Sequence, residues 1–269
     1  MAALQPALPF LLALLAVLWL DRATRRRGLD PPGFVSPARR AGGLAALGSA
    51  LALSSFAPLA ALGSAAVEPD FTTVPAWQLF ALHAVLLLAL GGWYVAGYAG
   101  SGARFADQVG LRASRPLVEV GFGTVFGIAA WLVVLVSAYL VALALAAWGG
   151  EELLPKSPPA AVAWLAGQSV VLRAALALSA GIVEEIFFRG LLQPRVGIVV
   201  STALFTLAHL SYGQLFMLLG VTILSFLYAW LVEWRQSLWA AMAAHAVFDL
   251  VQLLVVVPAV LREFGGFLP

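Results

Sequence analysis

Long runs of apolar residues, separated by short polar segments, recur along the whole chain. About 20 such residues are enough for a helix to cross a bilayer core of roughly 30 Å. We therefore predict an all-α integral membrane protein, with residues 1–269 forming a single polytopic domain of about eight membrane helices. Their expected bounds are near 4–20, 42–66, 76–99, 118–147, 174–192, 196–211, 214–232 and 237–257.

The segment 149–173 fits this pattern least well. Its first part, Glu151–Pro159, is polar and proline-rich, which indicates an external loop. The following residues 160–173 are apolar but end in an arginine, which we expect to snorkel to an interface. They predict either an interfacial segment or the start of one long tilted helix.

Composition strengthens the membrane interpretation. Hydrophobic residues make up 62% of the chain and charged residues 10%, with a mean hydropathy of +0.98, whereas soluble domains carry about 25% charged residues. The dispersed net charge of +2 argues against nucleic-acid binding. The absence of cysteine excludes disulfides, thiolate metal sites and a cysteine nucleophile. The excess of Arg over Lys is typical of a GC-rich bacterium, so we predict a multi-pass protein of a bacterial inner membrane.

Basic loops predict the orientation. Arginines gather in the segments 21–40 and 101–117, and short basic loops stay in the cytoplasm. Because arginines follow the first apolar run and do not precede it, we expect that run to be a retained helix and not a signal peptide. Both termini would then face away from the cytoplasm, and a turn at Arg189–Arg195 would face it.

Charged and polar side chains inside predicted spans are the candidate chemistry, because burying each charge costs roughly 2.5 to 3.5 kcal/mol. Glu185 and Arg189 lie four residues apart and share a helix face. Glu184 lies about 100° around the helix and has no local counter-ion. The candidates concentrate in the last four spans: Glu184, Glu185, Arg189, His209, His245 and Asp249.

Their depths are similar. With a rise of 1.5 Å per residue, Glu184 lies roughly 16 Å from Arg195, His245 roughly 15 Å from Arg235, and His209 roughly 21 Å from Arg195. The helix of His209 must therefore tilt or begin with an irregular turn. A purely structural polar network is the alternative, and it is the interpretation we favour for His83, which has no partner at helical spacing. For the set Glu184, His209 and His245, the shared depth favours function.

Three motifs carry a family resemblance. Glu184-Glu185-Ile-Phe-Phe-Arg189 resembles the EExxxR signature of the CAAX prenyl protease and bacteriocin-processing (CPBP) family, Phe205-Thr-Leu-Ala-His209 its FxxxH motif, and His245-Ala-Val-Phe-Asp249 its HxxxN or HxxxD motif. The motifs occur in family order across residues 174–257, the expected catalytic core. Residues 1–148 carry no recognisable motif and are expected to be accessory helices.

The resemblance implies a metal-independent intramembrane endopeptidase without a cofactor. Glu184 and His209 would polarise water, and His245 with Asp249 would stabilise the oxyanion, supported by Glu185, Arg189 and Phe205. Asp249 departs from the best-studied pattern, which has Asn, and an ionised carboxylate only accepts hydrogen bonds. We therefore expect Asp249 to orient His245 and to favour its protonated form. The expected partners are the bilayer and a membrane-anchored protein or peptide.

Two other functions remain open. A non-catalytic chaperone or immunity factor could use the same fold. A zinc-dependent protease could use Glu184, His209 and His245 as ligands, because two histidines and one carboxylate form a known catalytic zinc set. The identity of the substrate, including whether it is prenylated, and the oligomeric state are not specified by these patterns.

Overall fold

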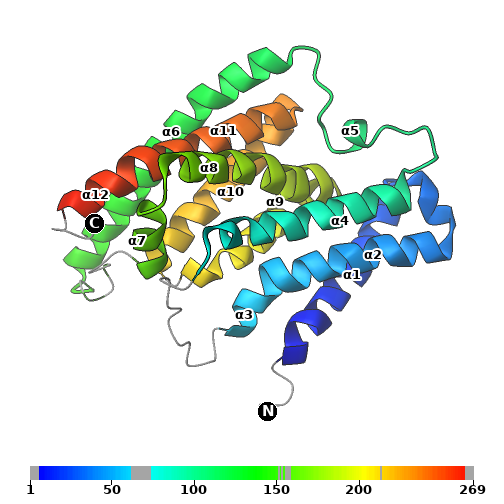
Figure 1. Ribbon diagram of the computed structural model, residues 1–269, viewed down its shortest axis with the longest axis horizontal. Coiled ribbons are helices and arrows are strands. Elements are labelled where there is room, and N and C mark those ends of the chain that lie inside the picture. The colour runs from blue at the N-terminus through cyan, green and yellow to red at the C-terminus, as the bar shows by residue number, and fades with distance from the viewer. Residues whose placement is uncertain are drawn as a thin grey trace.

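Every regular element in the described part of the chain is a helix (Figure 1). The computed structural model describes residues 6–61, 74–150, 152, 154, 159–212 and 214–263. The α-helices are α1 (Leu8–Arg26), α2 (Pro37–Leu51), α3 (Ala57–Ala61), α4 (Ala81–Gly97), α5 (Phe105–Gln108), α6 (Pro116–Ala147), α7 (Ala160–Ala166), α8 (Val170–Glu184), α9 (Gln193–Ala208), α10 (Leu215–Arg235), α11 (Leu238–Val251) and α12 (Val257–Glu263). The π-helical turns η3 (Ala52–Phe56), η7 (Glu185–Leu192) and η9 (Gln252–Val256) continue α2, α8 and α11, and short 3₁₀ turns are η2 (Pro32–Val35), η5 (Ala76–Phe80) and η8 (Leu210–Tyr212).

Five helical segments are long and apolar enough to cross a membrane, which confirms an all-α membrane protein. They are Pro37–Ala60, Ala76–Gly97, Pro116–Ala147, Leu215–Arg235 and Leu238–Arg262. The predicted number of eight is not confirmed. The helix α1 ends in a run of charged residues, and the helix formed by α8 and η7 carries Glu184, Glu185 and Arg189, so neither is uniformly apolar.

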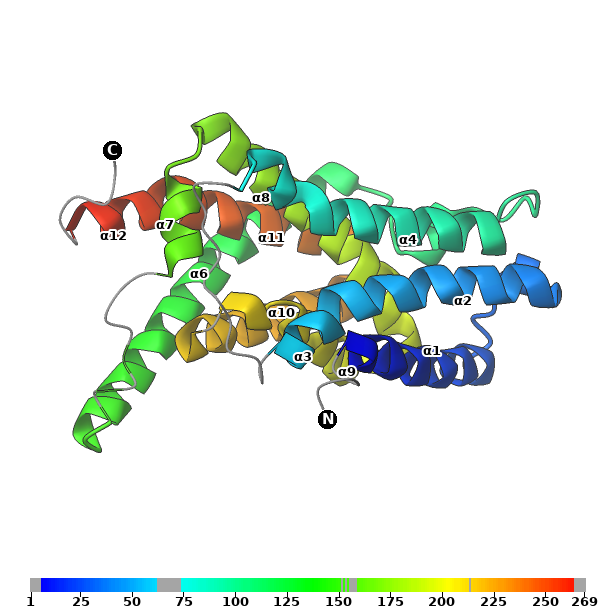
Figure 2. The ribbon, with the colours of Figure 1, turned by 60° about the horizontal axis from the view of Figure 1, so that its bottom comes forward.

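The helices form two groups with a central helical hairpin between them. The first group is α1, α2 and α4, and the second is α6, α10 and α11. Between them, α8 packs on both α4 and α11, while α9 packs on α10 and on η3 (Figures 1 and 2). Charged residues of the middle helices are therefore enclosed by apolar neighbours on both sides. The long helix α6 projects beyond the other helices in Figure 2.

The hairpin between α8 and α9 differs from the expected one. The chain was predicted to turn at Arg189–Arg195, but helical structure continues through these residues and breaks at Gly197, whose φ of +83° suits glycine. Ser201 then donates a hydrogen bond of 2.8 Å back to the Phe188 carbonyl. Arg189 and Arg195 are consequently buried and do not lie in a loop. The sequence left open whether the helix of His209 tilts or begins with an irregular turn, and the structure shows the irregular turn, at Gly197.

The segment 160–173 forms two elements and not one long helix. The helix α7 ends before Gly167, and the Ser169 side chain accepts a hydrogen bond from the Leu172 N–H as the N-cap of α8. Arg173 was expected to snorkel to an interface, and this expectation is wrong. It is buried, and its Nη1 donates to the Leu253 carbonyl at 2.7 Å, because the π-helical turn η9 leaves that carbonyl accessible.

Glycines set two close helix contacts. A Cβ added to Gly127 would collide with the backbone of Ala244, so α6 and α11 touch there through their backbones. On the other side of α11, a Cβ on Gly181 would lie 2.7 Å from the Ala246 nitrogen and 2.8 Å from the Met242 carbonyl oxygen. The helix α11 is therefore held tightly between α6 and α8.

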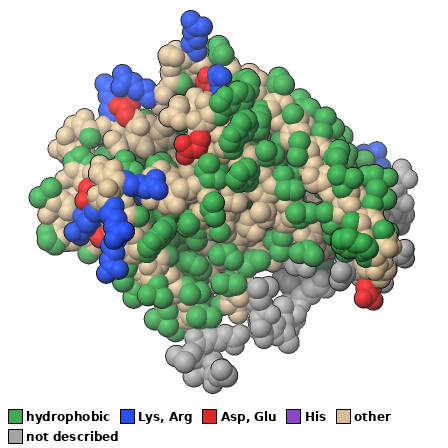
Figure 3. All heavy atoms as spheres, turned by 180° about the vertical axis from the view of Figure 1, so that it is seen from behind, with side chains coloured by type: hydrophobic (Ala, Val, Ile, Leu, Met, Phe, Trp, Pro, Cys, Tyr) green, Lys and Arg blue, Asp and Glu red, His purple; other side chains and the backbone are tan. Residues whose placement is uncertain are grey.

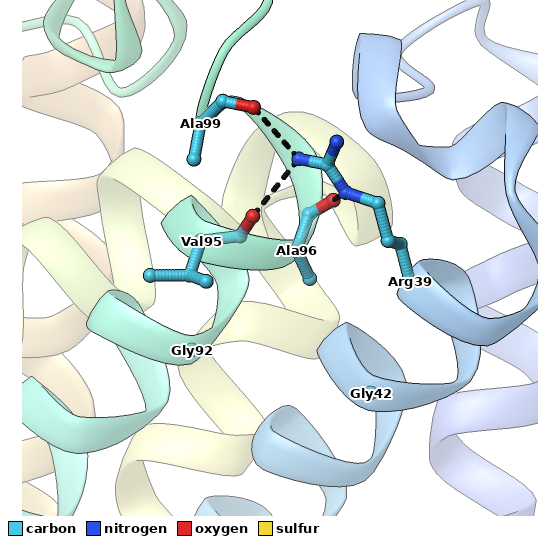
Figure 4. Close-up of a pocket in the computed structure, with 6 residues that line it drawn as sticks. All are labelled: Arg39, Gly42, Gly92, Val95, Ala96 and Ala99. Atoms are coloured by element: carbon cyan, nitrogen blue, oxygen red, sulfur yellow. Dashed lines mark hydrogen bonds between the residues drawn. The ribbon is translucent and has the colours of Figure 1, made fainter.

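Six arginines and two aspartates gather where α1 ends and α2 begins, a region that we call the arginine-rich end. There Arg40 pairs with Asp21 and Asp30. At the start of α6, Glu119 accepts two hydrogen bonds, of 2.7 and 3.0 Å, from Arg235 at the end of α10. Arg39 donates to three carbonyls at the end of α4 and so caps that helix (Figure 4). A cavity of about 570 Å³ lies beside it, between α2 and α4.

Candidate active site

Glu184 lies at the C-terminal end of α8, and its two carboxylate oxygens have different surroundings. Oε1 lies 3.3 Å from Nε2 of His83, and Oε2 lies 3.9 Å from Nε2 of His209. The side chain is 7% exposed, and Oε2 has no hydrogen-bond partner within the described residues. One oxygen is thus held by an imidazole while the other faces a second imidazole across a short gap.

His83, on α4, is part of this cluster, although its isolated position in the sequence had favoured a structural role. Its Nδ1 lies 2.8 Å from the Ser179 hydroxyl, and Ser179 lies on α8. Since a carboxylate only accepts hydrogen bonds, Nε2 carries the proton shared with Glu184. In a neutral ring, Nδ1 then accepts from Ser179. The bond to Ser179 therefore fixes the tautomer that can donate to Glu184.

His209 follows the last residue of α9, and its ring is oriented by its own helix. Its Nδ1 lies 2.8 Å from the carbonyl oxygen of Phe205, which can only accept, so Nδ1 donates. The ring also stacks on the Phe205 side chain, with centroids 4.5 Å apart. In the neutral ring, Nε2 therefore presents a lone pair toward Glu184.

A second cluster surrounds Glu185, which is fully buried. One oxygen, Oε1, lies 2.8 Å from Nδ1 of His245 and 3.1 Å from Nη1 of Arg189. The predicted pair of Glu185 with Arg189 is therefore present, and Glu185 also binds His245. On the far side of that ring, Nε2 lies 3.5 Å from Asp249. His245 is thus placed between two carboxylates, of which only Asp249 was expected from the sequence.

Aromatic rings and one serine complete the packing of this cluster. Tyr228, on α10, stacks on His245 with centroids 5.2 Å apart, and the Arg189 guanidinium lies 4.2 Å above the Phe205 ring. Arg189 also donates to the carbonyl and hydroxyl oxygens of Ser225. These contacts hold the buried charges in fixed positions. Tyr228 and Ser225 lie outside the three motifs, and their spacing gave no signal.

The site is more open on one side than on the other. The side chains of Glu184, His83 and His245 are 6 to 8% exposed, whereas those of His209 and Asp249 are 14% and 26% exposed. The most exposed side chains of the site are thus those of His209 and Asp249. The described residues contain no group of three or more His, Asp or Glu side chains arranged to hold a metal ion.

Comparison with known families agrees with the three motifs. Residues 166–251 match the family described as type II CAAX prenyl endopeptidase Rce1-like. We call this segment, which is similar to that family, the Rce1-like segment. The match confirms the resemblance that the motifs indicated. Because it covers α8, α9, α10 and α11, the Rce1-like segment contains Glu184, His209 and His245 but not His83.

One curated protein also matches this chain. The match is the uncharacterized protein YpbD of Bacillus subtilis (strain 168), to which this chain is 35% identical over 77 residues. The alignment covers 28% of this chain and 41% of YpbD. The chain thus spans about two fifths of the length of that relative. No solved structure matches. With the five candidate spans, these findings support a multi-pass bacterial membrane protein, and the Rce1-like match suggests a CAAX-type intramembrane protease.

Proposed function

We propose that this protein is an intramembrane glutamic endopeptidase, in which Glu184 and His209 activate the attacking water. The position of Glu184 carries the proposal, because Oε1 is held by His83 while Oε2 faces His209 at 3.9 Å. Two hydrogen bonds of about 2.8 Å from one water to these two atoms would subtend about 90° at the water oxygen. Both atoms are acceptors in the states described above, so one water can donate both of its protons to them.

Peptide hydrolysis then proceeds in two steps. Glu184 accepts a proton as the water oxygen attacks the carbonyl carbon, which gives a tetrahedral intermediate with a negative oxygen. When the intermediate collapses, the C–N bond breaks and the same proton passes to the leaving nitrogen. The products are one new carboxyl group and one new amine, and Glu184 returns to its ionised form.

We assign the stabilisation of the negative oxygen to His245. A doubly protonated ring has an N–H at both nitrogens, and the carboxylates of Glu185 and Asp249 favour that charge state by Coulomb attraction. Nδ1–H stays on Glu185, and Nε2–H is then available to the oxyanion. Before the oxyanion forms, Nε2–H faces Asp249 at 3.5 Å, which orients the ring without any donation by the carboxylate. The developing oxyanion then replaces Asp249 as the acceptor of that N–H.

The catalytic unit in this proposal extends beyond the Rce1-like segment. His83 comes from α4, in the part of the chain that carried no motif, and it holds the reacting carboxylate. The helices of residues 1–148 therefore contribute a positioning residue to the site as well as covering it. The sequence predicted only an accessory role for these helices, and the proposal adds to it the positioning of Glu184 by His83.

The decisive variant is Glu184→Gln, which removes the base and keeps the size of the side chain. We expect proteolysis to be abolished while the protein still folds and inserts. The exposed Glu152→Gln is the matched control, because it makes the same chemical change outside the site. Wild-type and variant proteins are compared by quantitative proteomics of membrane fractions, which also identifies the substrate. Identical cleavage products with Glu184→Gln would contradict the assignment, and no products from wild type would favour a non-catalytic membrane protein.

Chelation tests the zinc-dependent alternative. With a cleavable membrane peptide from that experiment, we expect full activity after exhaustive treatment of the purified protein with a chelator. Loss of activity on chelation, followed by recovery with zinc, would instead assign Glu184, His209 and His245 as metal ligands.

A further inference from the structure

A second cavity lies at the arginine-rich end, between α1 and the start of α9. Its volume is about 340 Å³. Three arginines at the end of α1 line it together with Arg195 of α9, and Trp19 lies at its edge. Its lining residue nearest to Glu184 in the sequence, Arg195, is 11 positions away, and no residue of the proposed catalytic site lines the cavity. The other three arginines are Arg22 and Arg26 of α1 and Arg27, which follows it directly.

These guanidinium groups have no acidic partners. Within the described residues, Asp21 pairs with Arg25 and Arg40, and no Asp or Glu lies within ion-pair distance of the four cavity arginines. Arg27 donates to the Pro194 carbonyl, which ties α1 to α9 and leaves its charge uncompensated. Within the described residues, Asp30 acts on Arg195 only beyond ion-pair distance, so none of the four positive charges around the cavity has a directly paired carboxylate.

Arg195 makes this cavity different from an exposed basic surface. It is 2% exposed, it lies 5.2 Å from the Trp93 ring, and it donates to the Leu191 carbonyl at 2.6 Å. Its Nε is buried without a hydrogen-bond partner. Its other contacts are with Tyr98 and with the Leu29 carbonyl, and no carboxylate pairs with it directly. Burying a guanidinium without a paired carboxylate is costly, so its position at the cavity wall points to a ligand that supplies negative charge.

The surface next to the cavity is apolar. The residues of α1 that precede the arginines on the same helix face are exposed, among them Leu11 at 51% and Leu15 at 65%, and Trp19 follows one turn later. Arg22 and Arg26 continue this face at helical spacing. Figure 3 shows basic side chains (blue) gathered at one end of the molecule beside extensive hydrophobic surface (green). A ligand that fills both parts needs an anionic head and apolar chains.

We propose that this cavity binds the phosphate of an anionic phospholipid, whose acyl chains lie along the exposed apolar face of α1. Guanidinium groups bind phosphate oxygens with paired hydrogen bonds. Basic pockets between membrane helices recognise anionic headgroups. The lipid would connect α1 to α9 at the turn that follows the catalytic helix, and it would neutralise Arg195.

The cavity arginines can be compared with other arginines of equal charge. In Arg22→Gln/Arg26→Gln, two exposed cavity residues lose their charge. In the control Arg104→Gln/Arg115→Gln, two exposed arginines outside the cavity are changed. Retention of phosphatidylglycerol and of phosphatidylcholine by the detergent-purified protein is measured by native mass spectrometry, with inorganic phosphate as a competitor.

We expect wild type and control to retain phosphatidylglycerol in preference to phosphatidylcholine. Each arginine near an anionic lipid contributes about a fivefold factor to lipid binding. The cavity variant should therefore retain phosphatidylglycerol about 30-fold less strongly than wild type, and Arg26→Gln alone should retain it about fivefold less strongly. Equal loss in the control would show a diffuse charge effect and overturn the proposal. Unchanged retention in the cavity variant would also overturn it. Displacement by millimolar inorganic phosphate would identify a simple anion site in place of a lipid site.

Discussion

At the scale of single residues, two consecutive glutamates have separate partners. Successive residues of a helix point about 100° apart, so Glu184 faces α4 and the end of α9, while Glu185 faces α11. Glu185 is bound by Arg189 and His245, and Glu184 contacts two histidines. This difference supports one carboxylate as the base and the other as a positioning group for His245.

His83 gives a prediction at this scale. We expect His83→Ala to lower kcat about 10- to 100-fold, the loss typical of groups that orient a reactive side chain, with little change in KM. The pH–rate profile should also change shape, because Glu184 loses the N–H that holds Oε1. His83→Gln should restore much of the activity, since its amide can donate to the same oxygen.

Leu86→Ala provides the control for His83. Leu86 is fully buried on the same helix, so this change lowers the Tm by creating a cavity. We expect kcat of the folded protein and its pH–rate profile to remain unchanged. If His83→Ala behaves like Leu86→Ala, with a lower Tm and an unaltered pH–rate profile, His83 is a packing residue only.

At the scale of elements, irregular helix geometry shapes the site. The turn η7, with π-helical hydrogen bonding, starts at Glu185, and widened turns of this kind are frequent at functional sites. The break at Gly197 then reverses the chain so that α9 returns past η7 and places His209 opposite Glu184. Close contact of α8 with α11 at Gly181 places Glu185, one turn later, beside His245.

Gly181→Val tests that contact. The added side chain has no room against the α11 backbone, so α8 and α11 must separate, at a cost of about 1 to 3 kcal/mol. We expect a lower Tm and a large loss of activity, because His245 moves away from Glu185. Gly121→Val is the control, since a Cβ at Gly121 meets nothing within 4 Å. Thermal unfolding and cleavage are measured for both, and equal behaviour would show that the contact at Gly181 does not set the site.

At the scale of the whole molecule, the central hairpin lies between two groups of helices, and six of the fourteen arginines gather at the arginine-rich end. Exposed apolar side chains cover α1 and α6, as expected for surfaces that face lipid. The site residues instead face inward, where Glu185 is paired with Arg189 and Glu184 contacts His83. The fold thus encloses charges that could not face hydrocarbon singly.

Orientation in the membrane can be tested with introduced cysteines, because the chain has none. The basic segments predict that Arg104→Cys lies in the cytoplasm and that Trp148→Cys, at an 86% exposed position, lies outside. An impermeant maleimide added to intact cells should label only the second variant. Labelling of Arg104→Cys without permeabilisation would reverse the topology. Arg195 is unsuitable for this experiment because it is buried.

Substrate choice is also a property of the whole assembly, because a buried site is reached most readily by a peptide held at the membrane. We expect anchoring to dominate recognition. A lipid anchor contributes roughly 0.8 kcal/mol per buried CH₂, whereas one side chain in a pocket discriminates by about 1 to 3 kcal/mol. One peptide sequence, with and without its anchor, is compared in liposomes containing the protein. Similar cleavage of both forms would show that water-borne peptides reach the site.

The sequence alone determined the membrane class, the three motifs and the pairing of Glu185 with Arg189. These properties depend on local composition and on helical spacing, which the order of residues defines directly. The same reasoning placed His209 and His245 at the depth of Glu184, since depth follows from the rise per residue.

Only the tertiary structure decided which distant groups meet. His83 lies 101 positions from Glu184, and no periodicity connects them, yet the packing of α4 on α8 brings them within 3.3 Å. The burial of Arg173 and Arg195 was likewise not predictable, because it depends on carbonyls freed by π-helical turns and on the position of the break at Gly197. Contacts between helices depend on how side chains fit together in space, and that fit is not encoded in the spacing along any one helix.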